Sequence, residues 1–154
     1  MVGIKFGLAV IIASACLAQS VEPLTEAGEW IGSAALSPDG KTLAFERSLK
    51  IFLRVLESGA VTHFAGDDEE EGFTSELKWS PDGQRIAFLR DYCAHCPHKL
   101  FLKNATGGAE FPLGGVCGAS PSWTPDGRYL IATEPVAEDF ENEECRLEIG
   151  RAHV

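Results

Sequence analysis

The chain has 154 residues, of which 45% are apolar and 23% are charged, and this is the composition of one ordinary globular domain. It excludes a disordered tail, a collagen-like fibre and a polytopic membrane protein. The net charge of −10 makes the chain a poor candidate for holding nucleic acid through its phosphates, so we expect no nucleic-acid partner. Eleven acids lie in two stretches without Lys or Arg, Asp67–Glu71 and Glu134–Glu144, and the rest of the chain is nearly neutral.

Residues 1–20 have the three parts of a secretory signal peptide. They are a basic start at Lys5, an apolar run shorter than the ~20 residues that span a bilayer, and small residues at a cleavage site. We expect cleavage after Ala18. The alternative is a lipoprotein-like box ending at Cys16, and only a lipid on that cysteine would attach the protein to a membrane. The sequence therefore predicts an exported protein, located in the bacterial periplasm or outside the cell.

The last seven residues, Glu148–Val154, resemble the translation of a widely used sequencing adapter, whose next triplet is a stop codon. We therefore expect the genuine sequence to run to about Leu147 and to continue beyond it. An ordinary C-terminal tail is the alternative.

An internal repeat organises residues 21–147. Similar segments begin at Leu36, Trp79 and Trp123, and their prolines are 43 and 44 residues apart. Each segment contains Ser/Thr-Pro-Asp-Gly, a turn in which Pro presets φ, Asp bonds locally and Gly accepts a positive φ. An apolar-rich strand follows each turn, so each motif predicts a tight β-hairpin. The repeat-turn residues are Pro38, Asp39, Gly40, Pro81, Asp82, Gly83, Pro125, Asp126 and Gly127.

Two more strands are expected in each complete period, at 51–56 and 61–64 in the first and at 100–103 and 109–113 in the second. Four short strands in ~43 residues are typical of a β-propeller blade. β-Sandwiches have similar strand spacing but do not repeat a turn sequence at a fixed period. The predicted fold is all-β, a partial β-propeller of about two and a half four-stranded antiparallel blades after the signal peptide. The blades are expected at about 26–68, 69–114 and 115–147.

The segment Trp79–Phe88 resembles the W-S-P-D-G-[KR]-x-[IL]-A-F repeat of the TolB-like, WD-like propeller family. The first copy departs from it at Leu36, and the third at Thr124 and at Ile131–Ala132. The resemblance implies a propeller of several blades. Such propellers occur in periplasmic translocation proteins, as amino-terminal gates of prolyl-oligopeptidase-type serine peptidases, and attached to amidohydrolases.

A closed propeller needs about four to eight blades, so we expect this chain to be a fragment. Within the repeat, Glu22–Thr25 resembles the end of an outer strand. Our hypothesis is that this stretch completes the last blade of a full ring.

The four cysteines of the mature chain fall in segments expected on the face opposite the turns. In an exported protein with an even count we expect disulfides, of which three pairings are possible. The alternative is a metal site, because Cys-x-x-Cys beside imidazoles has zinc-like ligand spacing. The disulfide candidates are Cys93, Cys96, Cys117 and Cys145, and the metal candidates are Cys93, His95, Cys96 and His98.

No catalytic motif is visible: there is no Gly-x-Ser-x-Gly, no His-Glu-x-x-His and no phosphate-binding glycine loop. We therefore expect no catalytic residue and no cofactor in this chain. The acidic stretches are expected to be solvated connections, or alternatively to bind a cation or a basic partner. Two functions remain. One is a non-enzymatic exported scaffold that binds another protein or a peptide, and the other is the gating propeller of a hydrolase whose catalytic domain lies downstream.

Overall fold

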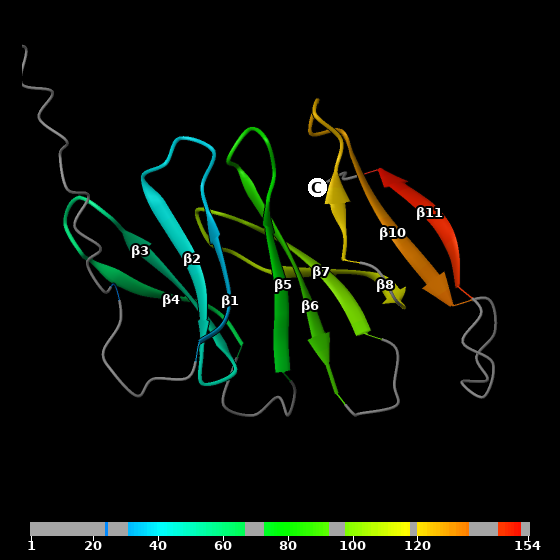
Figure 1. Ribbon diagram of the computed structural model, residues 1–154, viewed down its shortest axis with the longest axis horizontal. Helices are drawn as coiled ribbons and strands as arrows, with labels where there is room; N and C mark the ends of the chain where they lie inside the picture. The colour runs from blue at the N-terminus through cyan, green and yellow to red at the C-terminus, as the bar shows by residue number, and fades with distance from the viewer. Residues whose placement is uncertain are drawn as a thin grey trace, which may run out of the picture.

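The computed structural model describes Leu24 and residues 31–66, 73–92, 98–117, 120–135 and 145–151. All regular structure in these ranges is β, and it forms three antiparallel sheets that stand side by side (Figure 1). No helix among the described residues has the length and apolarity needed to cross a bilayer. The all-β prediction of a partial propeller is confirmed for this part of the chain, and the expected signal peptide lies outside it.

Each sheet is a meander in which consecutive strands are hydrogen-bonded neighbours. The first sheet contains β1 (Ile31–Leu36), β2 (Thr42–Arg47), β3 (Lys50–Val55) and β4 (Val61–Ala65). The second contains β5 (Phe73–Trp79), β6 (Arg85–Asp91), β7 (His98–Asn104) and β8 (Glu110–Val116). The third contains β9 (Ser122–Trp123), β10 (Tyr129–Pro135) and β11 (Cys145–Arg151).

The strands predicted between residues 31 and 135 are all present, and most run one to three residues longer than the sequence indicates. The expected outer-strand end at Glu22–Thr25 lies, apart from Leu24, outside the described residues. The largest difference is at β11. The sequence predicts a third strand beginning at Arg146–Leu147, whereas β11 begins at Cys145 and pairs with β10 through Arg151. The backbone edge of β10 gives this strand seven paired positions, whatever its side chains are. The adapter-like origin of residues 148–154 stays a prediction.

The core lies between the sheets, because alternate residues of a strand face the two neighbouring sheets. Between the first and second sheets, Ala44 and Ile51 of one meet Ile86 and Phe88 of the other. Between the second and third sheets, a separate cluster joins residues of β6, β7 and β8 to Leu130. Its buried members are Ala87, Leu89, Leu100, Leu102, Val116 and Leu130.

The tryptophan that ends the first strand of a sheet reaches across to the sheet before it. Trp79 Nε1 donates a hydrogen bond to the Ala35 carbonyl (3.0 Å), and Trp123 Nε1 donates to the Lys78 carbonyl (3.3 Å). Ala35 and Lys78 hold the same place in their own repeats. The tryptophans therefore join neighbouring blades.

Replacing Trp79 by Phe should lower the free energy of unfolding by about 1 kcal/mol, because the Ala35 carbonyl loses its donor while the ring remains. Urea unfolding of both proteins measures the difference. Leu36→Phe is the matched control at the equivalent position of the first repeat, where the side chain is exposed, and it should change stability by less than about 0.5 kcal/mol. Equal effects of the two substitutions would contradict the assignment.

Candidate functional site

The molecule has two ends with different chemistry. The three Pro-Asp-Gly turns, which follow β1, β5 and β9, lie at the upper ends of the sheets in Figure 1. Because consecutive strands are antiparallel, β2, β6 and β10 all end at the opposite side. We call these two ends the turn face and the loop face. The predicted division of the loops between two faces follows from this topology.

Each repeat turn is held by one hydrogen-bond pattern. In the second repeat, Ser80 Oγ donates to Asp82 Oδ1 (2.6 Å) and accepts from the Arg85 amide (2.9 Å), while the same Asp82 oxygen accepts from the Gln84 amide (3.0 Å). Gly83 closes the turn with φ of +70°, which glycine adopts without strain. The bonds recur around Ser37 and Thr124 at distances within 0.2 Å.

These bonds lower the pKa of the three turn aspartates. The pKa values of Asp39, Asp82 and Asp126 lie below the ordinary 3.8, first because the Ser or Thr hydroxyl donates to the carboxylate and second because a backbone amide does. One oxygen of each carboxylate is therefore occupied inside its own turn. The turn aspartates act in the structure as part of a rigid frame.

Removing the Ser80 hydroxyl should lower the free energy of unfolding by about 1–3 kcal/mol, because Ser80 is fully buried and both the Arg85 amide and Asp82 lose a hydrogen-bond partner. Because the pKa of Asp82 is lower in the folded chain than its ordinary 3.8, the ionised carboxylate stabilises the fold above that pH, and this contribution is lost as the pH falls through the lowered pKa. Ser80→Ala should therefore make the loss of stability at acidic pH less steep. Urea unfolding between pH 3 and 7 measures both effects. Ser58→Ala, in an exposed turn, is the control and should leave the curve unchanged.

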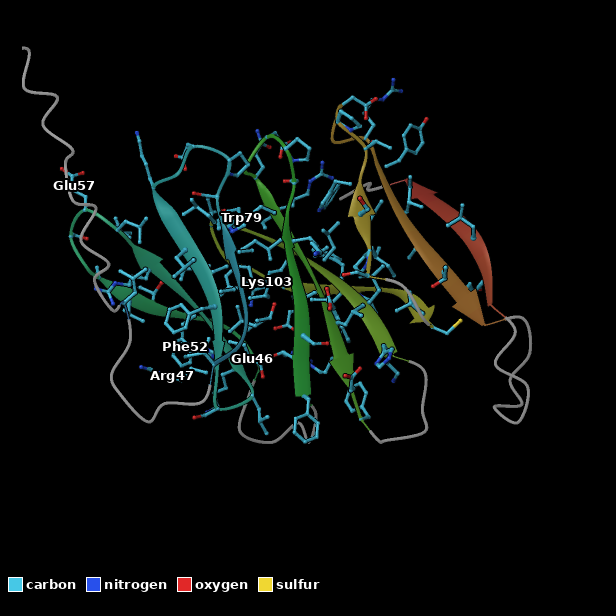
Figure 2. All side chains as sticks on the ribbon, viewed as in Figure 1. Glu46, Arg47, Phe52, Glu57, Trp79 and Lys103 are labelled. Carbon is cyan, nitrogen blue, oxygen red and sulfur yellow. The ribbon has the colours of Figure 1, made fainter. Side chains whose placement is uncertain are left out.

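A groove of about 600 Å³ opens on the turn face between the first and second blades. Its walls come from Leu53, Val55 and Thr62 of the first blade and from Trp79 of the second, which Figure 2 labels. The first two repeat turns lie along its rim. The groove therefore combines an aromatic and aliphatic wall with hydroxyl groups, a lining suited to a peptide.

One residue explains why the groove lies between these two blades. Thr42, the first residue of β2, lines it. In the second repeat the equivalent residue is Arg85, whose guanidinium donates to the Gly127 carbonyl of the third repeat (3.0 Å) and lies 5.2 Å from the Trp123 ring. The long side chain thus bridges the second and third blades on the turn face, and the short Thr42 leaves the corresponding space between the first two open.

The loop face carries an acid–imidazole pair and a disulfide. Asp91 Oδ1, at the end of β6, is hydrogen-bonded to His98 Nδ1 at the start of β7. Cys117 is disulfide-bonded, which agrees with its prediction as a disulfide cysteine. Cys93 and Cys96 lie outside the described residues, as does the side chain of Cys145, so the pairing stays a prediction.

The sequence-predicted metal site is mostly outside the described ranges. Of its four candidates, the structure describes His98 alone, and this side chain is paired with Asp91. Within the described ranges, no group of three or more His, Cys, Asp or Glu side chains is placed to hold a metal ion. The zinc alternative for Cys93, His95, Cys96 and His98 therefore stays a prediction, as do the roles of the two acidic stretches, which are largely undescribed.

Glu46 is a buried carboxyl that the sequence analysis missed. It lies near the end of β2, is 1% exposed, and its Oε1 has no hydrogen-bond partner among the described residues (Figure 2). Burial, and secondarily the like charge of Asp91, raise the pKa of Glu46 from the ordinary 4.5 to about 7. The joint between the first two blades therefore contains a group that titrates near neutral pH.

Comparison of the repeats shows what is unusual about Glu46. Its equivalent in the second repeat is Leu89, which is buried in the apolar cluster against the third blade. The equivalent residue of the third repeat is Thr133, so Glu46 is the only acid among the three equivalent positions. The sequence contained an indication of this buried acid, because Glu46 directly follows the apolar pair Ala44-Phe45 of a predicted strand.

Stability should fall as the pH rises through the range in which Glu46 ionises. The folded chain binds this proton more tightly than the unfolded chain, so the contribution is complete below pH 4.5 and is lost as the pH passes 7. The shift corresponds to about 3 kcal/mol in the free energy of unfolding.

Glu46→Leu and Glu46→Gln should both remove this dependence, and urea unfolding at pH 5 and pH 8 measures it. Glu57→Gln, at an exposed carboxyl in the turn after β3, is the matched control. If the Glu46→Gln variant lost stability between pH 5 and 8 as steeply as the unsubstituted chain, the assignment would be wrong.

The sequence matches one known family. The profile of the dipeptidyl peptidase IV N-terminal region matches residues 9–92, which is more than half of the chain. No curated protein matches it.

Several solved structures share the fold. A protein assigned as TolB from Agrobacterium tumefaciens has a TM-score of 0.63 at 17% identity, over 83% of this chain and 44% of that chain. TolB from Acinetobacter baumannii has a TM-score of 0.57 at 19% identity, over 83% and 33%. A protein assigned as dipeptidyl aminopeptidase IV from Bacteroides ovatus has a TM-score of 0.58 at 15% identity, over 86% and 25%. The chain spans less than half the length of each of these proteins.

Proposed function

This chain belongs to the family of the dipeptidyl peptidase IV N-terminal region, and on that premise we propose that it is part of an exported β-propeller that binds a protein or peptide as a scaffold. Its repeats are of the TolB-like, WD-like type, in keeping with the fold shared with two TolB structures. In this proposal the chain itself contributes binding surface, and it carries neither a catalytic residue nor a cofactor.

The observation that carries the proposal is the groove on the turn face. Both turns on its rim are fixed by internal hydrogen bonds, so the groove is largely preformed and a ligand does not have to order it. Its wall offers Trp79 and aliphatic side chains for apolar contact and threonine hydroxyls for hydrogen bonds. An extended peptide segment fits this combination of groups.

The location and the kind of partner follow from the sequence. The signal-like residues 1–20 support export to the periplasm or the exterior, and membrane attachment applies only if Cys16 is lipidated. The net charge of −10 argues against nucleic acid and favours a protein or peptide.

Filling the groove tests the scaffold function. Peptides are first selected from a display library against the full chain. They should bind the Thr42→Arg variant at least tenfold more weakly than the unsubstituted chain, as measured by fluorescence anisotropy. The fold should tolerate this substitution because the second repeat has Arg85 at the same place. Val61→Arg is the control on an exposed strand outside the groove, and it should change binding less than twofold. Peptides that bind all three proteins equally would place the binding surface elsewhere.

A second candidate function is the gating propeller of a prolyl-oligopeptidase-type peptidase or another hydrolase. It is favoured by the matched family itself and by the fold shared with the Bacteroides ovatus protein. In this case the groove and the loop face would select substrate for a catalytic domain elsewhere in the protein.

An active-site label separates the two candidates. Antibodies against this chain would isolate the native protein from its source, which is then treated with a fluorophosphonate probe for serine hydrolases. Labelling of the isolated polypeptide supports the gating function, and a polypeptide that stays unlabelled beside a labelled control peptidase supports the scaffold.

A further inference from the structure

The joint between the second and third blades shows what the open groove between the first two can hold. Arg85 fills that joint on the turn face with its guanidinium. Its Nη2 donates to the Gly127 carbonyl (3.0 Å) and lies 3.8 Å from Asp82 Oδ2, and its Cζ lies 5.2 Å from the centroid of the Trp123 ring. One carbonyl, one carboxylate and one indole therefore surround the guanidinium.

The equivalents of all three partners line the groove between the first and second blades. They are the glycine, the tryptophan and the aspartate at the same positions of the preceding repeats, Gly83, Trp79 and Asp39. What differs is the side chain that enters the space, because Thr42 stands at the position of Arg85. The first two blades thus present the partners of a guanidinium around an open groove.

Two contacts show that these partners are placed alike at both joints. The indoles of Trp79 and Trp123 each donate to the equivalent carbonyl of the preceding sheet, at 3.0 and 3.3 Å. A Cβ added to Gly83 or to Gly127 would lie 3.7 or 3.6 Å from Cδ of the equivalent proline in the preceding turn. A guanidinium in the groove can therefore meet a carbonyl and an indole in the way that Arg85 does at the next joint.

The charge of the groove favours the same group. Among the described residues that line it, Asp39 and Asp82 are carboxylates and none is a Lys, Arg or His. Asp39 Oδ1 accepts hydrogen bonds within its own turn, so Oδ2 is the equivalent of the oxygen that Arg85 approaches on Asp82. A planar guanidinium stacks on an indole while its N–H groups donate in the plane, which a lysine ammonium cannot do.

We propose that the groove is an arginine-binding site, and that the protein or peptide bound there places an arginine side chain between the first two blades. The guanidinium donates to the Gly83 carbonyl, lies over the Trp79 ring and pairs with Asp39. The backbone beside that arginine then runs along the aliphatic wall of Leu53 and Val55. This inference rests on the proposed binding function and adds the chemistry of its partner.

A small arginine derivative tests the site without a selected peptide. The probe is N-acetyl-arginine methylamide, and its matched analogue is N-acetyl-citrulline methylamide, in which a neutral urea replaces the guanidinium. The readout is the indole N–H NMR signal of Trp79 in the full chain, identified as the signal that the Trp79→Phe variant lacks. The arginine derivative should shift this signal saturably, and the citrulline derivative should bind at least fivefold more weakly because it carries no charge.

Two variants of the groove and one control locate the binding. Thr42→Arg should abolish the shift, because the chain's own guanidinium would occupy the groove as Arg85 occupies the next joint. Asp39→Asn should weaken binding at least fivefold, since the amide keeps an acceptor oxygen for the turn but loses the charge. Asp126→Asn is the matched control in the third repeat, outside the groove, and it should change the affinity less than twofold.

The second joint offers the reverse experiment. Arg85→Thr should open a groove like that beside Thr42, because it removes the guanidinium that lies over Trp123. The indole signal of Trp123, which does not respond in the unsubstituted chain, should then shift with the arginine derivative. A gain of binding of this kind would support the assignment of the three partners.

Equal binding of the arginine and citrulline derivatives would overturn the proposal, and so would a Trp79 shift that persists in the Thr42→Arg variant. The scaffold function would survive either result, because it depends on the weaker binding of selected peptides to that variant. Selected peptides that bind Thr42→Arg unchanged, beside an arginine-specific shift of Trp79, would instead contradict the scaffold function and support the arginine site.

Discussion

The second sheet is apolar on both faces, and this constraint governs how the described sheets are arranged. The central strand β6 shows it most clearly, since five consecutive residues from Ile86 to Arg90 are buried. Ile86 and Phe88 face the first blade, whereas Ala87 and Leu89 face the third. Such a strand leaves no face for water, so the second sheet is stable only between two others. Stacking of the three sheets side by side satisfies this requirement.

Stacking alone leaves the sheets free to slide, and polar groups at their edges fix the positions. The indoles of Trp79 and Trp123 each bond to a carbonyl in the preceding sheet. Lys103 bonds to a carbonyl of the first blade on the outer side. Because a backbone carbonyl is a directional acceptor, each of these bonds specifies one register between two sheets. The apolar contacts provide most of the stabilisation, and the edge bonds select among similar stackings.

The repeated turn made most of this fold predictable from the sequence. Ser/Thr-Pro-Asp-Gly determines a local conformation through φ preferences and short-range hydrogen bonds, so its recurrence located the hairpins, and the blades followed from the period. Strand ends were less predictable. The β7 strand begins at His98 and not at Leu100, because cross-strand pairing with β8 continues as long as the partner backbone is present.

Contacts between blades were not predictable in the same way. The bond from Lys103 to the Phe64 carbonyl joins residues 39 positions apart, and its existence depends on how two sheets are rotated relative to each other. The equivalence of Glu46 with Leu89 was available from the aligned repeats. The alignment does not show that the Glu46 carboxyl is buried with one oxygen lacking a hydrogen-bond partner among the described residues. That burial depends on how β2 packs against the second blade.

The two joints between neighbouring sheets differ both on the turn face and toward the loop face. Between the second and third blades, Arg85 bridges the turn face and Leu89 fills the apolar position toward the loop face. Between the first and second blades, Thr42 leaves the turn face open and Glu46 places an acid in the interior. Both differences reduce stability at one joint, by lost contacts and by desolvation of a carboxyl. Deviations from a repeat that weaken packing are most often retained where a binding surface needs the room or the charge. On this argument the joint between the first two blades is the specialised one, and the joint behind it serves as its rigid support.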